Sequence, residues 1–122
     1  MTIVCVDNTP IMLQTLKENA ARSYPHADVQ AFLAEEHALS YAEKRGCDVL
    51  LCEINPPRLE GLFLADKIKK LNPRVNIIFV TVCSESEHAK AVMRLKPSGY
   101  LTKEATDAQI LEELLNLRYP VA

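Results

Sequence analysis

The chain contains five short apolar runs, separated by longer stretches in which apolar residues recur at helical spacing. Runs of about four to eight such residues predict strands, and the helical spacing between them predicts amphipathic helices. The third and fourth runs are apolar at consecutive positions, as in strands buried on both faces of a sheet. The predicted strands are Thr2–Val6, Asp28–Phe32, Asp48–Ile54, Val75–Thr81 and Gly99–Thr102.

A helix is predicted after each strand, because start and stop signals flank each periodic segment. Two capping boxes, Ser84 with Glu87 and Thr106 with Gln109, predict the starts of the last two helices. The predicted helices run from Asn8 or Thr9 to about Ser23, over Ala34–Arg45, from Gly61 to Leu71, over about Glu85–Leu95, and from Thr106 until Pro120 ends the pattern. The expected inward residues of the third helix are Leu64, Ile68 and Leu71, and those of the fifth are Ile110, Leu111, Leu114 and Leu117.

Strict alternation of strands and helices predicts right-handed βαβ units and a parallel sheet covered by helices on both faces. We therefore expect one α/β domain over residues 1–122, a doubly wound five-stranded sheet of order 2-1-3-4-5. In such a sheet the carboxyl ends of the strands meet at one edge, where ligands bind. Four residues with reactive side chains end or follow strands there: Asp7, Glu53, Thr81 and Lys103.

Composition narrows the class of protein. The chain has 122 residues, a net charge of −2, and 48% hydrophobic and 25% charged residues. These values fit an ordinary globular domain and argue against a nucleic-acid surface. No apolar run is long enough to cross a membrane, and no signal peptide pattern follows Met1. Four cysteines without a CxxC pair are expected to be reduced core or near-core thiols in a cytoplasmic protein: Cys5, Cys47, Cys52 and Cys83. We expect the three histidines at the surface: His26, His37 and His88.

The strand ends together resemble the receiver domain of two-component response regulators, over nearly the whole chain. Asp7 and Asn8 match the family's acidic pair, and Glu53 stands where the phospho-accepting aspartate is expected. The other matching residues are Pro57 and Gly61 in the loop, Thr81 as the switch hydroxyl, Tyr100 as the rotating aromatic and Lys103 as the lysine after it. The run KPSGYLTK over residues 96–103 is most similar to receivers that precede LytTR-type DNA-binding domains.

The resemblance implies a flavodoxin-like (CheY-like) three-layer sandwich with a signalling function and no enzymatic activity. It implies a Mg²⁺ pocket around Asp7, Asn8, Glu53 and Asn55, because Mg²⁺ takes oxygen ligands. It also implies that Thr81 and Tyr100 remodel the surface of the fourth helix, fifth strand and fifth helix. A sensor kinase, an output domain or a second copy would bind there. The domain alone lacks a recognition helix for DNA.

Three departures from the family pattern change this expectation. Glu53 adds a methylene, which moves the carboxylate by about 1 Å, enough to cost on the order of 100-fold in a positioned reaction. Asn8 removes one charge and a strong ligand, so Mg²⁺ binding should be weak. Val82 follows Thr81 where the family usually has a small residue. We therefore expect an atypical receiver in which Glu53 is a permanent anion that pairs with Lys103 and partly imitates the phosphorylated state.

Two other functions remain open at this point. The pocket could be inert, which would leave a scaffold or dimerisation module that ignores phosphorylation. The second alternative is a flavodoxin-like cofactor protein. It is disfavoured because the chain has only three glycines and no phosphate-binding loop. Single residues also have structural explanations: Asp7 as a helix cap, Thr81 as a strand former and Tyr100 as core packing.

Overall fold

The computed structural model describes residues 1–54, 60–82 and 89–121. Its strands are β1 (Thr2–Val6), β2 (Asp28–Phe32), β3 (Val49–Ile54), β4 (Asn76–Thr81) and β5 (Gly99–Thr102). They form one sheet of order β2-β1-β3-β4-β5 in which every neighbouring pair is parallel. The predicted strand order is confirmed, and the strand ends agree with the prediction to within one residue.

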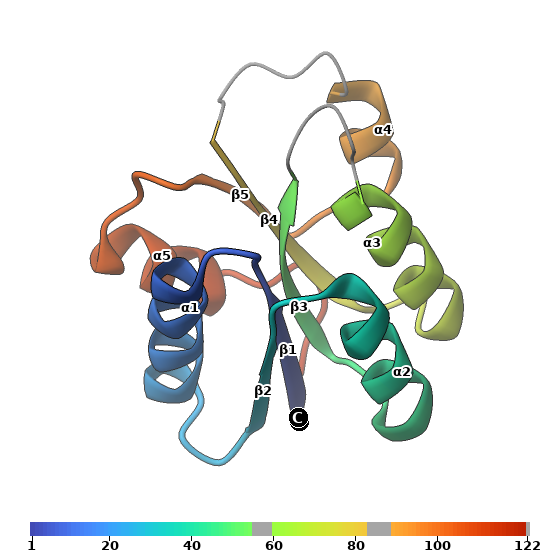
Figure 1. The fold of residues 1–122 in the computed structure, drawn as a ribbon, viewed down its shortest axis with the longest axis horizontal. Helices are drawn as coiled ribbons and strands as arrows, with labels where there is room; N and C mark the ends of the chain where they lie inside the picture. The colour runs from blue at the N-terminus through green and yellow to red at the C-terminus, as the bar shows by residue number, and fades with distance from the viewer. Residues whose placement is uncertain (55–59, 83–88, 122) are drawn as a thin grey trace.

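Helices cover both faces of the sheet (Figure 1). They are α1 (Pro10–Ser23), α2 (Glu35–Arg45), α3 (Glu60–Leu71), α4 (Ala89–Arg94) and α5 (Asp107–Leu115). α1 and α5 lie on one face, and α2, α3 and α4 lie on the other, which gives the expected three layers. No helix in the described part of the chain is long and apolar enough to cross a membrane.

The core lies on both sides of the central strands. Every residue of β3 and β4 is buried, as the continuous apolar runs predicted. One apolar cluster lies between the sheet and α2, α3 and α4, and a second lies between the sheet and α1 and α5. The sheet is therefore held from both faces, which fixes the positions of its strand ends.

Helix ends follow the predicted signals in part. Thr106 and Gln109 form the predicted capping box, with a 2.8 Å bond from the Thr106 amide to Gln109 Oε1. Gly46 ends α2 with φ +79°, a conformation that glycine adopts without strain. Thr9 takes the N-cap position of α1, but its side chain makes no capping bond. The capping box at Ser84 and Glu87 lies outside the described residues.

One predicted inward residue, Leu71, is wrong, and α5 ends earlier than predicted. Leu71 is 54% exposed, because the buried side of α3 runs through Leu64 and Ile68 and reaches Asn72 rather than Leu71. The Asn72 side-chain amide donates to the Cys47 carbonyl at 3.0 Å. Leu117 lies beyond the end of α5, although it still packs against the core.

The chain leaves α5 early because a buried asparagine binds the segment that follows. Asn76, at the start of β4, is fully buried. Its Nδ2 donates to the Tyr119 carbonyl at 2.9 Å, and its Oδ1 accepts from the Tyr119 amide at 2.7 Å. These two bonds replace the helical bonds that Tyr119 would otherwise make, and they attach the segment to the sheet.

Candidate functional site

Four of the predicted site residues lie at the carboxyl edge of the sheet. Asp7 directly follows β1, Glu53 is the penultimate residue of β3, Thr81 ends β4, and Lys103 directly follows β5. Asp7, Glu53 and Thr81 are buried, even though two of them carry an ionisable side chain. Buried carboxylates require compensation by charge or hydrogen bonds, so their partners define the site.

Lys103 is the cation that joins the two carboxylates. Its Nζ lies 2.6 Å from Glu53 Oε2 and 3.2 Å from Asp7 Oδ1. The lysine side chain is 17% exposed, so the pairs are largely screened from water. Its backbone is fixed as well, because the Lys103 amide donates to the Thr81 carbonyl at 2.7 Å. The structure thus brings together residues that are 50 and 96 positions apart in the sequence.

Glu53 is held through both of its carboxylate oxygens. Oε2 accepts from Lys103, and Oε1 accepts from the Asn8 amide at 2.8 Å. Asn8 therefore contributes to the site through its backbone, while its side chain is exposed. A carboxylate bound on both oxygens is fixed in orientation.

Asp7 is the most buried ionisable group of the site. Its Oδ1 accepts from the Thr9 amide at 2.8 Å and from Lys103. Burial raises the pKa of Asp7, the Thr9 amide opposes this rise, and the negative charge of Glu53 adds to it. Asp7 Oδ2 is buried and has no hydrogen-bond partner among the described residues.

The pKa of Lys103 is raised above its ordinary value of 10.5. Burial alone would lower this pKa, but the hydrogen bond to Glu53 and the charge of Asp7 outweigh burial. The lysine is therefore held in its charged form, as expected for an ammonium group beside two carboxylates.

The two predicted switch residues lie close to this group in the fold. Thr81 is buried next to the backbone of Lys103, and Tyr100 is partly buried and packs against the apolar cluster beneath α2, α3 and α4. Their switching roles stay predictions. Val82 is exposed, at 65%.

The described residues do not by themselves make up a Mg²⁺ site. Asp7 Oδ2 is a suitable oxygen donor, but both oxygens of Glu53 are bound to protein donors and Asn8 is exposed. Asn55, the other predicted ligand, lies outside the described residues. Across residues 1–54, 60–82 and 89–121, no three His, Cys, Asp or Glu side chains form a group that could hold a metal ion.

Gly61 brings α3 against the end of β3. A Cβ at this position would lie 1.9 Å from the Glu53 carbonyl oxygen and 3.0 Å from Cys52 Sγ. No larger residue fits without movement of the backbone, so this glycine sets how closely α3 approaches Glu53. The predicted loop proline Pro57 lies outside the described residues.

Two acidic residues near the site were not predicted. A cavity of about 220 Å³ adjoins Glu53 and is also lined by Glu35 and Glu60. Burial raises the pKa of Glu35, and the negative charges of Glu60 and Glu53 raise it further. The signal was present in the sequence, since Glu35 begins the helix after β2 and Glu60 begins the helix after β3, at the same edge of the sheet.

Among the described residues, no cysteine or histidine belongs to the charged group, although Cys52 lies beside it, with its Sγ donating to the Glu53 carbonyl at 3.6 Å. Cys5, Cys47 and Cys52 are free and buried, as predicted, and burial raises the pKa of Cys5 and Cys47 to about 12. Such thiols are unreactive. His26 and His37 are exposed, as predicted. Cys83 and His88 lie outside the described residues.

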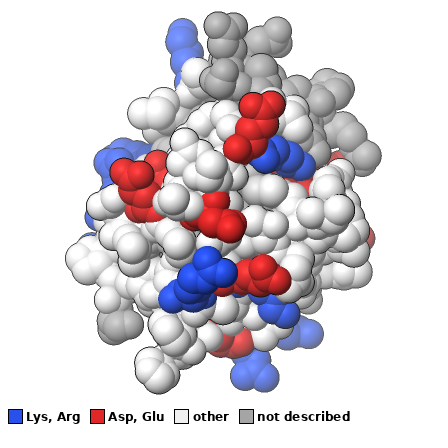
Figure 2. Space-filling view, turned by 90° about the vertical axis from the view of Figure 1, so that its left-hand side faces the viewer, with Lys and Arg blue, Asp and Glu red and all other residues white. Residues whose placement is uncertain are grey.

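The face formed by α1 and α5 carries scattered charges (Figure 2). On this face acidic and basic side chains are interspersed among uncharged residues, and neither sign forms a continuous patch. A surface of this kind lacks the basic stripe typical of proteins that bind the nucleic-acid backbone.

The chain is similar in sequence to bacterial regulatory proteins. The chain is 28% identical over 116 residues to the transcriptional regulatory protein DegU of Brevibacillus brevis, which covers 94% of this chain and 48% of that protein. It is 23% identical over 113 residues to the nitrate/nitrite response regulator protein NarL of Escherichia coli, covering 93% of this chain and 52% of that protein. The chain thus spans about half the length of these two relatives.

Solved structures show the same fold. A CheY-like receiver domain protein from Methanospirillum hungatei matches with a TM-score of 0.80 and 23% identity, over 93% of this chain and 90% of that one. The BeF3-activated DrrB receiver domain matches with a TM-score of 0.79 and 21% identity, over 93% of both chains. The family model of the response regulator receiver domain matches residues 3–115. Because that match extends from β1 to the end of α5, the protein belongs to the response regulator receiver domain family.

Proposed function

We propose that this chain is an atypical receiver that signals without ordinary aspartyl phosphorylation, with Glu53 as a built-in anion. The observation that carries the proposal is the 2.6 Å pair between Lys103 Nζ and Glu53 Oε2. In the family chemistry suggested by the resemblance, this lysine neutralises charge on the transferred phosphoryl group. In this chain the same cation is already paired with a carboxylate.

The second oxygen of Glu53 supports the same proposal. A carboxylate attacks a phosphoryl donor through a lone pair, and both Glu53 oxygens accept hydrogen bonds at 2.8 Å or less. Each oxygen keeps a further lone pair, but the two bonds hold the carboxylate in one orientation in a buried site. Mg²⁺ binding is also weak on this proposal, because Asn8 replaces an acid and Asp7 Oδ2 is the only unpartnered buried carboxylate oxygen among the described residues.

The output surface is the face built from α4, β5 and α5, reached through Thr81 and Tyr100. Tyr100 belongs to β5 and packs partly against the cluster that also contains Val92 of α4. A change in the Tyr100 ring would therefore alter contacts of both elements. We assign this face to a sensor kinase, an output domain or a second copy, and the output to transcription, in line with the similarity to the transcriptional regulatory protein DegU.

Intact mass spectrometry tests the proposal directly. The protein is incubated with a small acyl phosphate donor, with and without Mg²⁺, beside the variant that combines Glu53→Asp with Asn8→Asp. We expect no stable adduct on the wild-type protein and a Mg²⁺-dependent gain of one phosphoryl group on the variant, because the variant restores the shorter acid and the second ligand. A stable phosphoryl group mapped to Glu53 of the wild-type protein would overturn the proposal.

A further inference from the structure

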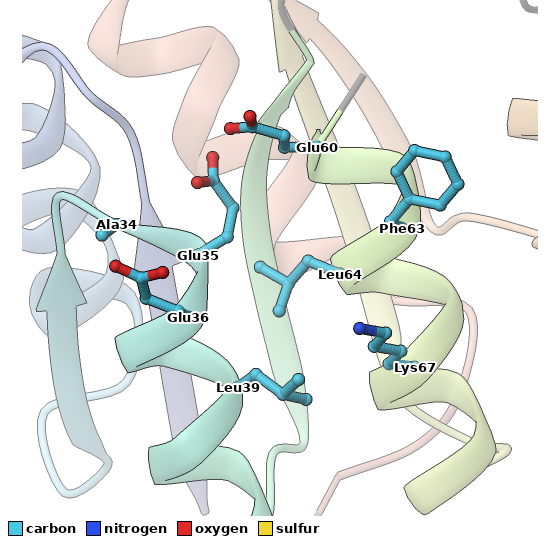
Figure 3. A pocket seen from close by; sticks show the side chains of 8 residues that line it. All are labelled: Ala34, Glu35, Glu36, Leu39, Glu60, Phe63, Leu64 and Lys67. Atoms are coloured by element: carbon cyan, nitrogen blue, oxygen red, sulfur yellow. The ribbon is translucent and has the colours of Figure 1, made fainter. Parts of the chain in front are cut away.

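A groove between α2 and α3 lies next to the candidate site and is not used by the proposed function. It has a volume of about 430 Å³. Leu39 and Leu64 line its apolar part, and Phe63 stands at its edge (Figure 3). Phe63 is 65% exposed, although a large aromatic side chain normally packs. Leu33 is 53% exposed and lines the adjoining cavity of about 220 Å³.

Three carboxylates gather at one end of the groove. Glu35 and Glu36 come from the first turn of α2, and Glu60 comes from the first residue of α3. Figure 3 shows the side chains of Glu35 and Glu60 pointing toward one another across the groove. Burial raises the pKa of Glu35, and the charges of Glu60 and Glu53 and a side-chain hydrogen bond with Glu60 raise it further. Among the described residues that line the groove, Lys67 is the one basic residue, and it lies toward the other end of it.

This arrangement fits an extended cation rather than a metal ion. The carboxylates are spread over two helices, and no group of acids in the described part of the chain is placed to hold a metal ion. A guanidinium group spreads its charge over a planar fork and binds carboxylates through two parallel hydrogen bonds. The apolar residues beside the acids would contact an aliphatic side chain next to that cation. Among the described lining residues, three acids and one lysine give the groove the charge that a basic segment complements.

We propose that the groove between α2 and α3 binds a basic amphipathic segment of a partner protein. An Arg or Lys of that segment pairs with Glu35, Glu36 and Glu60, and an adjacent aliphatic side chain packs against Leu39 and Phe63. This surface differs from the face of α4, β5 and α5, so the inference stands or fails independently of the proposed function.

The probe is a synthetic helical peptide of about 14 residues built from Leu, Ala and Arg, with the Arg residues on one side of its apolar stripe. It is titrated into the isotope-labelled protein, and amide shifts are followed by NMR at low salt. We expect shifts confined to α2, α3 and the residues of the adjoining cavity. A peptide with Glu in place of Arg should not bind, and added salt should weaken binding because the charges are partly exposed.

Matched variants distinguish binding in the groove from nonspecific attraction between a basic peptide and an acidic protein surface. Glu36→Gln combined with Glu60→Gln should weaken binding about fivefold, the range expected for exposed ion pairs. Phe63→Ser should weaken it through the apolar contact. Glu18→Gln on α1 removes a charge from an exposed side chain on the other face and should leave binding unchanged.

Three results would overturn the inference. They are no binding at about millimolar peptide, shifts centred on α4, β5 and α5 or on α1, and equal weakening by Glu18→Gln. Self-association of the protein that the Glu36 and Glu60 changes abolish would assign the groove to a second copy, and would also refute a partner segment. Amide spectra outside the groove report whether each variant is folded, and Phe63→Ser provides a second variant at an exposed position.

Discussion

At the scale of single residues, the site depends on one cation shared by two buried carboxylates. Asp7 and Glu53 come from neighbouring strands, and Lys103 contacts both. Buried charges of like sign repel, so without a cation at this point the two acids would destabilise the fold. Lys103 is therefore expected to stabilise the fold as well as the geometry of the site.

Replacement of Lys103 tests this role. Lys103→Met should lower the free energy of unfolding by about 3 kcal/mol at neutral pH, because it leaves two buried carboxylates without their cation. The combination of Lys103→Met with Glu53→Gln should lose less, since one of those charges is then removed. Denaturant unfolding of the wild-type protein, the two single variants Lys103→Met and Glu53→Gln, and the double variant gives the comparison. If the double variant loses as much as the sum of the two single changes, the pair contributes no coupling.

The same residue gives a pH dependence of known sign. Because the folded-state pKa of Lys103 is raised above 10.5, its contribution is complete below pH 10.5 and is lost as pH rises through the folded value. The difference between wild type and Lys103→Met should therefore shrink above pH 10.5. The pKa of Asp7 is raised above its ordinary value of 3.8 in the folded protein. Ionisation of Asp7 above pH 3.8 therefore lowers the free energy of unfolding, whereas a carboxylate with a lowered pKa would increase it.

At the scale of elements, the approach of α3 to β3 sets the position of Glu53. Gly61→Ala would place a methyl group 1.9 Å from the Glu53 carbonyl oxygen, so the helix must move away. We expect a loss of about 1–3 kcal/mol in the free energy of unfolding, the usual cost of overpacking. Gly99→Ala is the control, because the atoms nearest to its methyl group belong to the Glu113 side chain, whose carboxylate end can move away. An equal loss in the two variants would contradict a specific role for Gly61.

Strands and helix starts could be predicted where a local sequence pattern marks them. Helix ends could not be predicted where a single long-range polar contact determines them. Continuous apolar runs identified β3 and β4, and the Thr106 capping box identified the start of α5. The end of α5 was not predicted correctly, because Asn76 accepts a hydrogen bond from the Tyr119 amide. These residues are 43 positions apart, and local periodicity does not report such a contact. Leu71 was assigned to the buried side because the spacing from Ile68 allows either Leu71 or Asn72 there.

At the scale of the whole molecule, strand order gathers residues that are distant in the sequence. The order 2-1-3-4-5 follows from alternation and crossover handedness. It therefore predicts that four residues lie at one edge: Asp7, Glu53, Thr81 and Lys103. The groove between α2 and α3 was not predicted, because side-chain directions on two helices depend on how those helices pack. Glu35 and Glu60 meet only once α2 and α3 are placed side by side.

Variants of Glu53 test whether this residue influences the association of the protein with a second copy. Glu53→Asp and Glu53→Gln are compared with the wild-type protein for self-association by analytical ultracentrifugation, with Glu18→Gln as a distant charge control. If Glu53 imitates a phosphorylated acid, Glu53→Gln should weaken association, because the neutral amide no longer pairs with Lys103. Equal behaviour of all three forms would favour an inert scaffold whose contacts ignore this position.

The double anchoring of Glu53, by Lys103 and by the Asn8 amide, has a consequence for control in the cell. An acyl phosphate is lost by hydrolysis, and this loss returns a conventional receiver to its inactive state. A genetically encoded side chain cannot decay in this way, so on the proposed function no phosphatase could turn this protein off. Its influence would instead follow the number of copies present, set by synthesis and degradation.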